Sequence, residues 1–337
     1  MNKKSFAAIA FACTALLGIT MTGCQKKTNN DTTTDTDTAA VVKNTFDADS
    51  AWQFCDKQCA FGPRTMNSEA HEQCKQWIIA KFQQYGCETI EQKADLKGYD
   101  GTILKSTNII ARTKGDPDKP RIIICAHWDS RPWADNDPDS TNWRKPVMAA
   151  NDGASGVAVM LELARIIQAD TTLQVGVDFI CFDAEDWGTP QWLNRTEDES
   201  WALGSKYWAQ NETYPKQFAA QYGILLDMVG GENARFYQEG VSRYYAQHII
   251  DKVWNAARIA GFSDYFPNEE GGTINDDHLP MNQFAKIPTI DIIPFYADNK
   301  QSSFGSTWHT ISDDMKHIDK NTLKAVGQTL LQLLYTE

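Results

Sequence analysis

The sequence has no cluster of lysine or arginine residues beyond its extreme N-terminus, and its 337 residues carry a formal net charge of -12. Because nucleic-acid phosphates are bound by basic surfaces, this shortage of clustered positive charge argues against a nucleic-acid-binding protein. The sequence also has no internal repeat and, after Val41, no segment that resembles a linker. With 42% hydrophobic residues the chain can bury a large core, so we expect one domain spanning residues 41–337.

Residues 1–23 contain an apolar stretch that is too short to span a membrane comfortably as a mature helix, and they predict an export signal instead. Lys3 and Lys4 precede the apolar stretch, and small residues precede Cys24. The ending Met-Thr-Gly-Cys24 resembles a bacterial lipoprotein cleavage site, at which the cysteine is lipidated and becomes the new N-terminus. We therefore expect an exported, periplasm-facing lipoprotein that Cys24 anchors to a bacterial membrane, the outer membrane; a soluble exported protein is the alternative.

Residues 24–40 contain very few apolar side chains and repeat threonine and aspartate, so they predict a flexible tether. Export would permit disulfide bonds among the four cysteines at positions 55, 59, 74 and 87, although their spacing does not select a pair. Cys125 and Cys181 lie in apolar, strand-like runs and are expected to be buried thiols.

Apolar periodicity predicts helices at residues 68–85, 153–168, 201–210, 243–259 and 320–334. Short apolar strands alternate with these helices: TNIIAR, RIIICAHWDS, VGVDFICFDAED, YGILLDMVG and IPTIDIIPF. These strands are too apolar for a half-exposed sheet. The pattern therefore predicts an α/β fold with a mixed, largely parallel central sheet and helices on both faces.

A histidine or an acidic residue follows four of these strands. They are His127 and Asp129, then Glu185 and Asp186, then Asp227, and then His309. Ligands of open α/β sheets bind beyond the carboxyl ends of the strands, so we expect these side chains to converge on one edge of the sheet. Imidazole and carboxylate groups suit zinc, and the candidate ligands are His127, Asp152, Asp186, Asp227 and His309.

The adjacent pair Glu185 and Asp186 suggests a division of roles at the end of a strand. One carboxylate can bind a metal while its neighbour faces the substrate as a general base. Each residue taken singly has a simpler interpretation. The pair fits a solvated acidic loop, and Asp152 in AANDGASG fits a turn or a helix N-cap.

Six motifs in order narrow these alternatives: AHWDS, NDGASGVAVMLELAR, FDAED, LLDMVG, INDDH and STWHT. Together, across roughly residues 108–319, they resemble the zinc-dependent aminopeptidase superfamily and, within it, the animal-type glutaminyl cyclases. The resemblance implies a bacterial glutaminyl-peptide cyclotransferase with the α/β/α sandwich fold of the zinc aminopeptidases.

The resemblance also implies one zinc ion per chain, bound by Asp152, Asp186 and His309, with Glu185 as the general base. Asp186 stands where the superfamily usually has glutamate, so the metal or the strand end would have to lie slightly closer. In the two-zinc aminopeptidases the positions of His127 and Asp227 complete a second metal site. A two-zinc aminopeptidase of the same fold is therefore the alternative function.

Three features favour the cyclase. LLDMVG and INDDH match the cyclase pattern, in which Asp227 and Asp276 form a hydrogen-bonded acidic network with Glu185. Trp308 directly precedes the histidine of the WHT motif, and Trp192 lies near the position of a cyclase pocket tryptophan. Aromatic walls of this kind suit a pocket for a small side chain.

The implied substrate-binding residues are Trp192, Ile293, Phe304 and Trp308. The expected reaction is an acyl transfer that converts the N-terminal glutamine of a peptide or protein to pyroglutamate with release of ammonia. The expected partners are such peptide substrates and, through the lipid anchor, a membrane, with no nucleic acid and with the protein acting as a monomer. The cysteine pair of the animal enzymes is not reproduced, because Cys125 has no evident partner.

Overall fold

The computed structural model describes residues 40–113, 119–193, 195, 197–211 and 220–337. The predicted signal peptide and all but the last residue of the predicted tether lie outside the described residues. None of the described helices is both long enough and apolar enough to cross a membrane.

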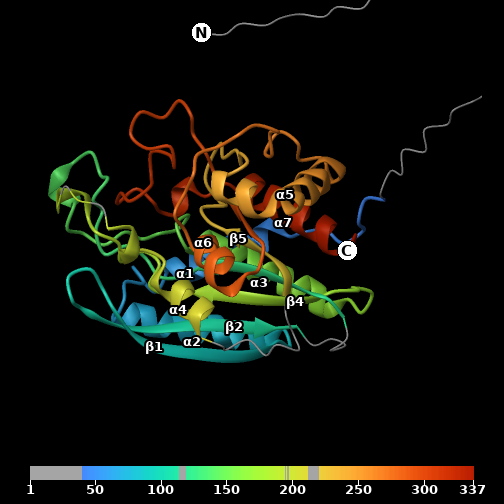
Figure 1. Cartoon of the computed structure of the whole chain (residues 1–337), viewed down its shortest axis with the longest axis horizontal. Coiled ribbons are helices and arrows are strands. Elements are labelled where there is room, and N and C mark those ends of the chain that lie inside the picture. Colours follow the sequence, from blue (N-terminus) through green and yellow to red (C-terminus); the bar gives the residue numbers. More distant parts are fainter. Residues whose placement is uncertain (1–39, 114–118, 194, 196, 212–219) are drawn as a thin grey trace, which may run out of the picture. The chain divides into compact units, whose positions relative to one another are not determined.

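A six-stranded sheet forms the centre of the fold, with the strand order β1-β2-β4-β3-β5-β6 (Figure 1). The pairs β1–β2 and β2–β4 are antiparallel, and the other three pairs are parallel, so the predicted mixed and largely parallel sheet is confirmed. The strands are β1 (Glu88–Lys97), β2 (Ile103–Arg112), β3 (Arg121–His127), β4 (Gly176–Phe182), β5 (Ala220–Leu226) and β6 (Thr289–Ile292).

Seven helices accompany the sheet in the described residues: α1 (Ala48–Cys59), α2 (Glu69–Gln84), α3 (Ala154–Ala169), α4 (Leu203–Gln210), α5 (Gly240–Ala260), the short α6 (His278–Pro280) and α7 (Lys320–Leu334). The five predicted helices correspond to α2, α3, α4, α5 and α7. The sequence analysis missed α1, α6 and the edge strand β1.

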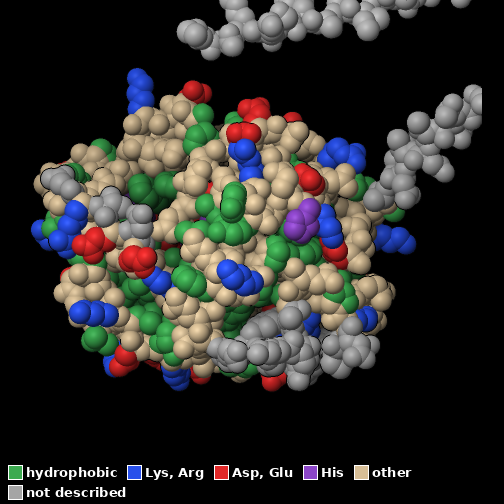
Figure 2. All heavy atoms as spheres, in the orientation of Figure 1, with side chains coloured by type: hydrophobic (Ala, Val, Ile, Leu, Met, Phe, Trp, Pro, Cys, Tyr) green, Lys and Arg blue, Asp and Glu red, His purple; other side chains and the backbone are tan. Residues whose placement is uncertain are grey.

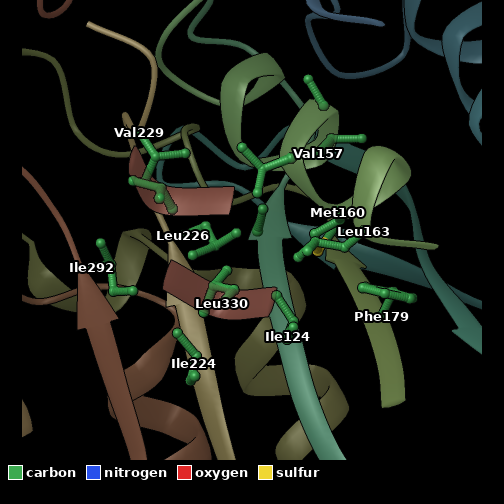
Figure 3. Close-up of a cluster of buried hydrophobic side chains, with 14 of the residues drawn as sticks. Ile124, Val157, Met160, Leu163, Phe179, Ile224, Leu226, Val229, Ile292 and Leu330 are labelled. Atoms are coloured by element: carbon green, nitrogen blue, oxygen red, sulfur yellow. The ribbon is translucent and has the colours of Figure 1, made fainter. Parts of the chain in front are cut away.

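The two faces of the sheet bury different sets of side chains, because neighbouring residues on a strand point in opposite directions. In β3, Ile122 and Ile124 belong to the large core that includes α1, α2, α3, α5 and α7. Ile123 and Cys125 belong to a smaller core on the other face, with Trp208 of α4. Figure 3 shows the large core, where Leu163 and its neighbours on α3 meet the strands.

Local capping signals fix the ends of several helices. Ser68 caps α2 by accepting a hydrogen bond from His71 N, and Gly86, with a φ of 90°, follows the end of this helix as predicted. Helix α4 begins at Leu203, two residues later than predicted, because Ala202 adopts a left-handed conformation. Trp201 therefore lies before the helix.

All six cysteines in the described part of the chain are buried, and none of them forms a disulfide bond. The prediction for Cys125 and Cys181 is confirmed, whereas no disulfide bond forms among the other four. Cys55 instead donates a hydrogen bond from its thiol to the carbonyl oxygen of Ala150, at 3.0 Å.

Candidate active site

The carboxyl ends of the parallel strands border a cavity of about 380 Å³. Acidic, aromatic and apolar side chains line it: Asp152, Glu185, Trp201, Asp227, Met228, Thr273, Ile274, Asn275, Asp276, Ile293, Ser303, Phe304, Trp308 and His309. On the face of the molecule seen in Figure 2, lysine, arginine and acidic side chains are scattered. Four of the cavity-lining residues, by contrast, carry carboxyl groups: Asp152, Glu185, Asp227 and Asp276.

Asp152, Asp186 and His309 lie close together, and Asp152 and His309 line this cavity. One ligand atom from each can be chosen so that all three atoms lie within 4.8 Å of one another. His309 Nε2 is 3.6 Å from Asp152 Oδ2 and 3.3 Å from Asp186 Oδ1. The second oxygen of Asp186 is buried and has no hydrogen-bond partner among the described residues. One imidazole and two carboxylates, with an unsatisfied oxygen, fit a zinc site.

The backbone before α3 sets the position of Asp152. The carboxylate of Asp313 accepts hydrogen bonds from Asn151 N and Asp152 N, at 2.7 and 3.0 Å. Gly153 has a φ of 103°, and a Cβ atom there would lie 2.8 Å from the carbonyl oxygen of Asp129. This turn therefore requires glycine, and it directs the chain into α3.

Two buried aspartates hold the segment that follows β4. The carboxylate of Asp129 accepts hydrogen bonds from Glu185 N and Asp186 N, at 3.1 and 3.2 Å. The carboxylate of Asp183 accepts from Thr107 N at 2.6 Å and lies 2.8 Å from His71 Nε2. Asp183 thus braces the strand end, whereas the next two acids point toward the cavity region.

The ring of His309 stacks with two tryptophan rings. The ring centroid of Trp308 is 3.7 Å away and that of Trp201 is 5.9 Å away, both in stacked orientations. The second ring nitrogen of His309, Nδ1, is 3.6 Å from Asp135 Oδ1. A carboxylate beside Nδ1 favours the tautomer that leaves Nε2 free to bind a metal.

A second group of possible metal ligands shares Asp152 with the first. His127 Nε2 is 2.9 Å from Asp152 Oδ1 and 3.4 Å from Asp227 Oδ1. Ligand atoms of these three residues also lie within 4.8 Å of one another. Asp152 therefore lies between the two predicted groups and directs one oxygen to each, and the positions of the residues are compatible with one metal ion or two.

Glu185, Asp227 and Asp276 all line the cavity. The hydrogen bonds predicted between them do not form among the described residues, and the three carboxyl groups influence one another through their charges. Burial raises the pKa of Asp227 to about 8, and the charge of Asp276 adds to this increase. Burial also raises the pKa of Glu185 well above its ordinary value, with further contributions from Asp186 and Asp276.

The sequence analysis missed a second layer of buried polar residues behind Asp276. Asp276, His278 and Asp291 can place one ligand atom each within 4.8 Å of one another. His278 Nε2 lies 3.0 Å from Glu239 Oε2. An available signal was the aspartate in the middle of the apolar run IPTIDIIPF, because a charge in a buried strand requires a partner.

The predicted pocket residues Ile293, Phe304 and Trp308 line the cavity, but Trp192 does not. Trp201 lines the cavity in its place. The physical reason is that the chain folds back after the loop: Ala202 N donates to Glu185 O and Leu203 N donates to Ala184 O, both at 3.1 Å. These bonds bring Trp201 beside Glu185, whereas Trp192 lies farther out, against Trp133.

Known proteins resemble this chain over most of its folded part. The family model "Peptidase family M28" matches residues 108–334. A glutaminyl cyclase of Bacteroides thetaiotaomicron, solved with N-acetylhistamine bound, is 49% identical; the alignment covers 87% of this chain and 99% of that chain, with a TM-score of 0.83. The glutaminyl cyclase of Tannerella forsythia is 45% identical, with coverage of 87% and 100% and a TM-score of 0.84.

A curated relative with a different activity also matches. Aminopeptidase YwaD of Bacillus subtilis (strain 168) is 28% identical over 256 residues, which are 73% of this chain but only 48% of that protein. The chain thus spans about half the length of this aminopeptidase. The family match covers most of the folded part, from β2 to α7. The chain belongs to peptidase family M28 and has the fold of the zinc aminopeptidases.

Proposed function

We propose that this protein is a zinc-dependent glutaminyl-peptide cyclotransferase, which converts an N-terminal glutamine to pyroglutamate and releases ammonia. The observation that carries the proposal is the cavity itself. The buried carboxyl group of Glu185 lines it together with Asp152 and His309, and Asp186 completes the group of possible zinc ligands beside them. The similarity to two bacterial glutaminyl cyclases at 45–49% identity supports this assignment.

Asp152, Asp186 and His309 would hold the zinc ion. When bound, zinc supplies a Lewis acid that polarises the side-chain carbonyl group of the substrate glutamine. Trp201 and Trp308 stack on His309 and restrict its rotation, so the imidazole is already oriented before a ligand binds.

Glu185 would transfer the proton that the reaction moves. It accepts a proton from the substrate α-amine as that nitrogen bonds to the side-chain amide carbon, and it returns a proton to the departing nitrogen, which leaves as ammonia. The raised pKa of Glu185 suits both steps, because the group must alternate between its two protonation states near neutral pH. Asp227, with a pKa of about 8, would be protonated there and would not repel the ionised base.

The walls of the cavity would select the substrate side chain. Ile293, Phe304 and Trp308 come from the segment between β6 and α7, and Trp201 comes from the loop before α4. These apolar groups enclose the CH₂ groups of a glutamine side chain and exclude water from the reacting amide.

Incubation of the purified protein with a glutamine-initiated peptide, followed by mass spectrometry, tests the proposal. Loss of one ammonia molecule from the peptide is the expected result. Loss of the whole first residue would indicate an aminopeptidase instead and would refute the cyclase.

The aminopeptidase is the second candidate because His127, Asp152 and Asp227 form a further group that could hold a metal. In that reaction a water molecule, and not the substrate amine, attacks the carbonyl carbon. Metal analysis separates the two functions: we expect one tightly bound zinc ion per chain for the cyclase and two for the aminopeptidase.

We also propose that the protein is exported, is lipidated at Cys24 and acts as a membrane-anchored monomer. The basic N-terminal residues, the short apolar stretch and the residues before Cys24 support this location. Its substrates would then be peptides and proteins of the same compartment that expose an N-terminal glutamine.

A further inference from the structure

Four half-buried aromatic side chains form a cluster outside the cavity, which we call the aromatic patch: Tyr99, Trp133, Trp187 and Trp192. The ring of Trp133 is central, with centroid distances of 5.5 Å to Tyr99, 5.2 Å to Trp187 and 6.0 Å to Trp192. None of these residues is buried in the main cores, and Leu193, beside the patch in sequence, is 40% exposed. The patch therefore leaves aromatic surface open to solvent.

Three loops contribute to the patch, and two of them, the segments after β3 and β4, also carry residues of the candidate active site. Tyr99 lies in the turn between β1 and β2, Trp133 follows β3, and Trp187 and Trp192 follow β4. Trp187 is the residue directly after Asp186. In Figure 1 the β1–β2 turn and the loops after β3 and β4 lie at the same end of the sheet, at the left of the view.

A buried arginine connects the patch to the wall of the cavity. The guanidinium carbon of Arg131 is 5.5 Å from the ring centroid of Trp133 and 4.7 Å from that of Trp201, which lines the cavity. The two rings thus lie within about 10 Å of each other, a distance that an extended peptide spans in about three residues.

Hydrogen bonds fix these loops relative to the cavity. Asn136 Nδ2 donates to the carbonyl oxygen of Trp308 at 3.1 Å, and Gln191 N donates to Asp135 Oδ2 at 2.9 Å. Trp187 Nε1 donates to Asp100 Oδ1 at 3.4 Å. A surface held in this way can bind a ligand with little loss of conformational freedom.

We propose that the aromatic patch is a subsite for the peptide chain beyond the N-terminal glutamine, and that it binds an aromatic side chain at the third or fourth residue of the substrate. The proposal rests on the proposed function, because it requires the first residue to occupy the cavity. The chemistry of the patch selects the side chain. An aromatic side chain of a peptide can pair edge-to-face with the half-buried tryptophan and tyrosine rings of the patch. The guanidinium carbon of Arg144 lies 4.6 Å from the Trp192 ring, and its positive charge would repel a basic side chain there.

The continuity of the patch with the cavity favours a peptide substrate as the occupant over a separate protein partner. A peptide whose first residue occupies the cavity, which Trp201 and Trp308 line, must leave the cavity across its rim. The segments that follow β3 and β4 carry both the cavity-lining residues Asp152, Glu185 and Trp201 and three of the four patch residues, so a peptide that leaves the cavity along them reaches the patch.

Three peptides of equal length test the subsite: Gln-Gly-Gly-Gly, Gln-Gly-Phe-Gly and Gln-Gly-Gly-Phe. With the unmodified protein we expect kcat/KM to be about two- to tenfold higher for at least one phenylalanine peptide than for the glycine peptide, as an aromatic contact would give. In the variants Trp192→Ala and Tyr99→Ala this ratio should fall toward one. Tyr244→Ala, which removes an 82% exposed tyrosine from α5, is the matched control and should keep the ratio.

Binding without turnover separates the subsite from the reaction. The same peptides are titrated calorimetrically into Glu185→Gln protein, alone and combined with Trp192→Ala. Tighter binding of a phenylalanine peptide that is lost with Trp192 supports the subsite even where the unmodified protein releases no ammonia, an outcome that would refute only the proposed function. Equal affinities for all three peptides, or a preference that survives both patch substitutions, would overturn the subsite.

The patch could instead contact a second copy of this chain, and size-exclusion chromatography with light scattering tests this alternative. An unmodified protein that is dimeric, with monomeric Trp192→Ala and Tyr99→Ala variants, would identify the patch as a contact between copies and would also overturn the proposal. We expect all of these proteins to have the same mass in solution.

Discussion

Burial and the neighbouring charges of Asp186 and Asp276 both raise the pKa of the Glu185 carboxyl group. Glu185 is only 9% exposed, and burial raises the pKa of its carboxyl group well above the ordinary value. We expect Glu185→Gln to lower kcat by roughly 10²- to 10⁴-fold, because the amide cannot exchange the proton that the reaction moves. Ammonia release from a glutamine peptide measures this loss. The zinc content of the variant should equal that of the unmodified protein, and an active variant would rule out Glu185 as the base.

Substitution of a proposed zinc ligand should lower the metal content of the protein. We expect Asp152→Ala and His309→Ala each to lose bound zinc, because each substitution leaves only two of the three ligands. Atomic absorption on dialysed protein measures the metal per chain. Asp314→Ala is a suitable control, since Asp314 is a partly exposed acid outside this group. Full zinc occupancy in both ligand variants would contradict the assignment.

The sequence predicted these chemical groups better than the residues that hold them in place. Glu185, Asp186 and Asp227 follow apolar strands directly, so the strand pattern alone places them at one edge of the sheet. Asp313 was not predicted, because it acts by accepting hydrogen bonds from the backbone before α3. Such a role depends on how a distant loop returns to the site, which short-range patterns do not encode.

At the scale of secondary structure, the prediction succeeded where the hydrophobic pattern was strong. The closing helix was predicted at residues 320–334, and α7 has these bounds. The strand β1 was missed because it is an edge strand: only one of its ten residues is buried, so its sequence lacks an apolar run. The error over Trp192 and Trp201 has a similar origin, since the fold of the loop before α4 is set by contacts with Ala184 and Glu185.

Helix α4 packs closely against the segment that carries the base, and Gly204 permits this contact. A Cβ atom at Gly204 would lie within van der Waals overlap of the Asp183 carbonyl oxygen and 2.7 Å from Asn108 Oδ1. We expect Gly204→Ala to lower the free energy of unfolding by about 1–3 kcal/mol, because the helix must move away from the strand end. Turnover should fall as well, since the movement displaces Glu185.

Urea denaturation followed by circular dichroism measures the effect of Gly204→Ala. Gln210→Ala, at an exposed position on the same helix, tests whether a change in helix propensity alone is responsible. A Gly204→Ala protein with unchanged stability and turnover would show that the contact between α4 and the strand end is not constrained.

The predicted export signal and the lipidation site at Cys24 concern the location of the whole molecule in the cell. In a bacterial host that processes lipoproteins, we expect the full chain to be recovered with the membrane fraction, because an acyl chain on Cys24 would anchor it. Cys24→Ser removes the thiol that is lipidated and should shift the protein to the soluble fraction. Immunoblotting of the two fractions measures the change, and an unchanged distribution would contradict lipidation at Cys24.

Glu239, a buried carboxylate behind the cavity, is expected to influence the stability of the whole molecule in acid. Glu239 caps α5 by accepting hydrogen bonds from Val241 N and Ser242 N, and it also accepts from Ile274 N, a cavity-lining residue. Burial opposes its ionisation, but His278 and these backbone donors lower its pKa to about 2. Ionised Glu239 therefore joins α5, the cavity wall and His278.

Folding thus favours the ionised form of Glu239, whose ordinary pKa is 4.5. Its contribution to the free energy of unfolding is fully present above pH 4.5 and is lost as the pH falls toward 2. We expect Glu239→Gln to lower stability by about 1–3 kcal/mol at pH 7, because hydrogen bonds to a charged group are replaced by weaker ones. The variant should also lose less stability than the unmodified protein between pH 5 and pH 3 in urea titrations.

Glu232→Gln, at an exposed glutamate, is the control and should leave both the stability at pH 7 and its pH dependence unchanged. The same pH dependence in Glu239→Gln and the unmodified protein would show that ionisation of Glu239 does not contribute to acid stability.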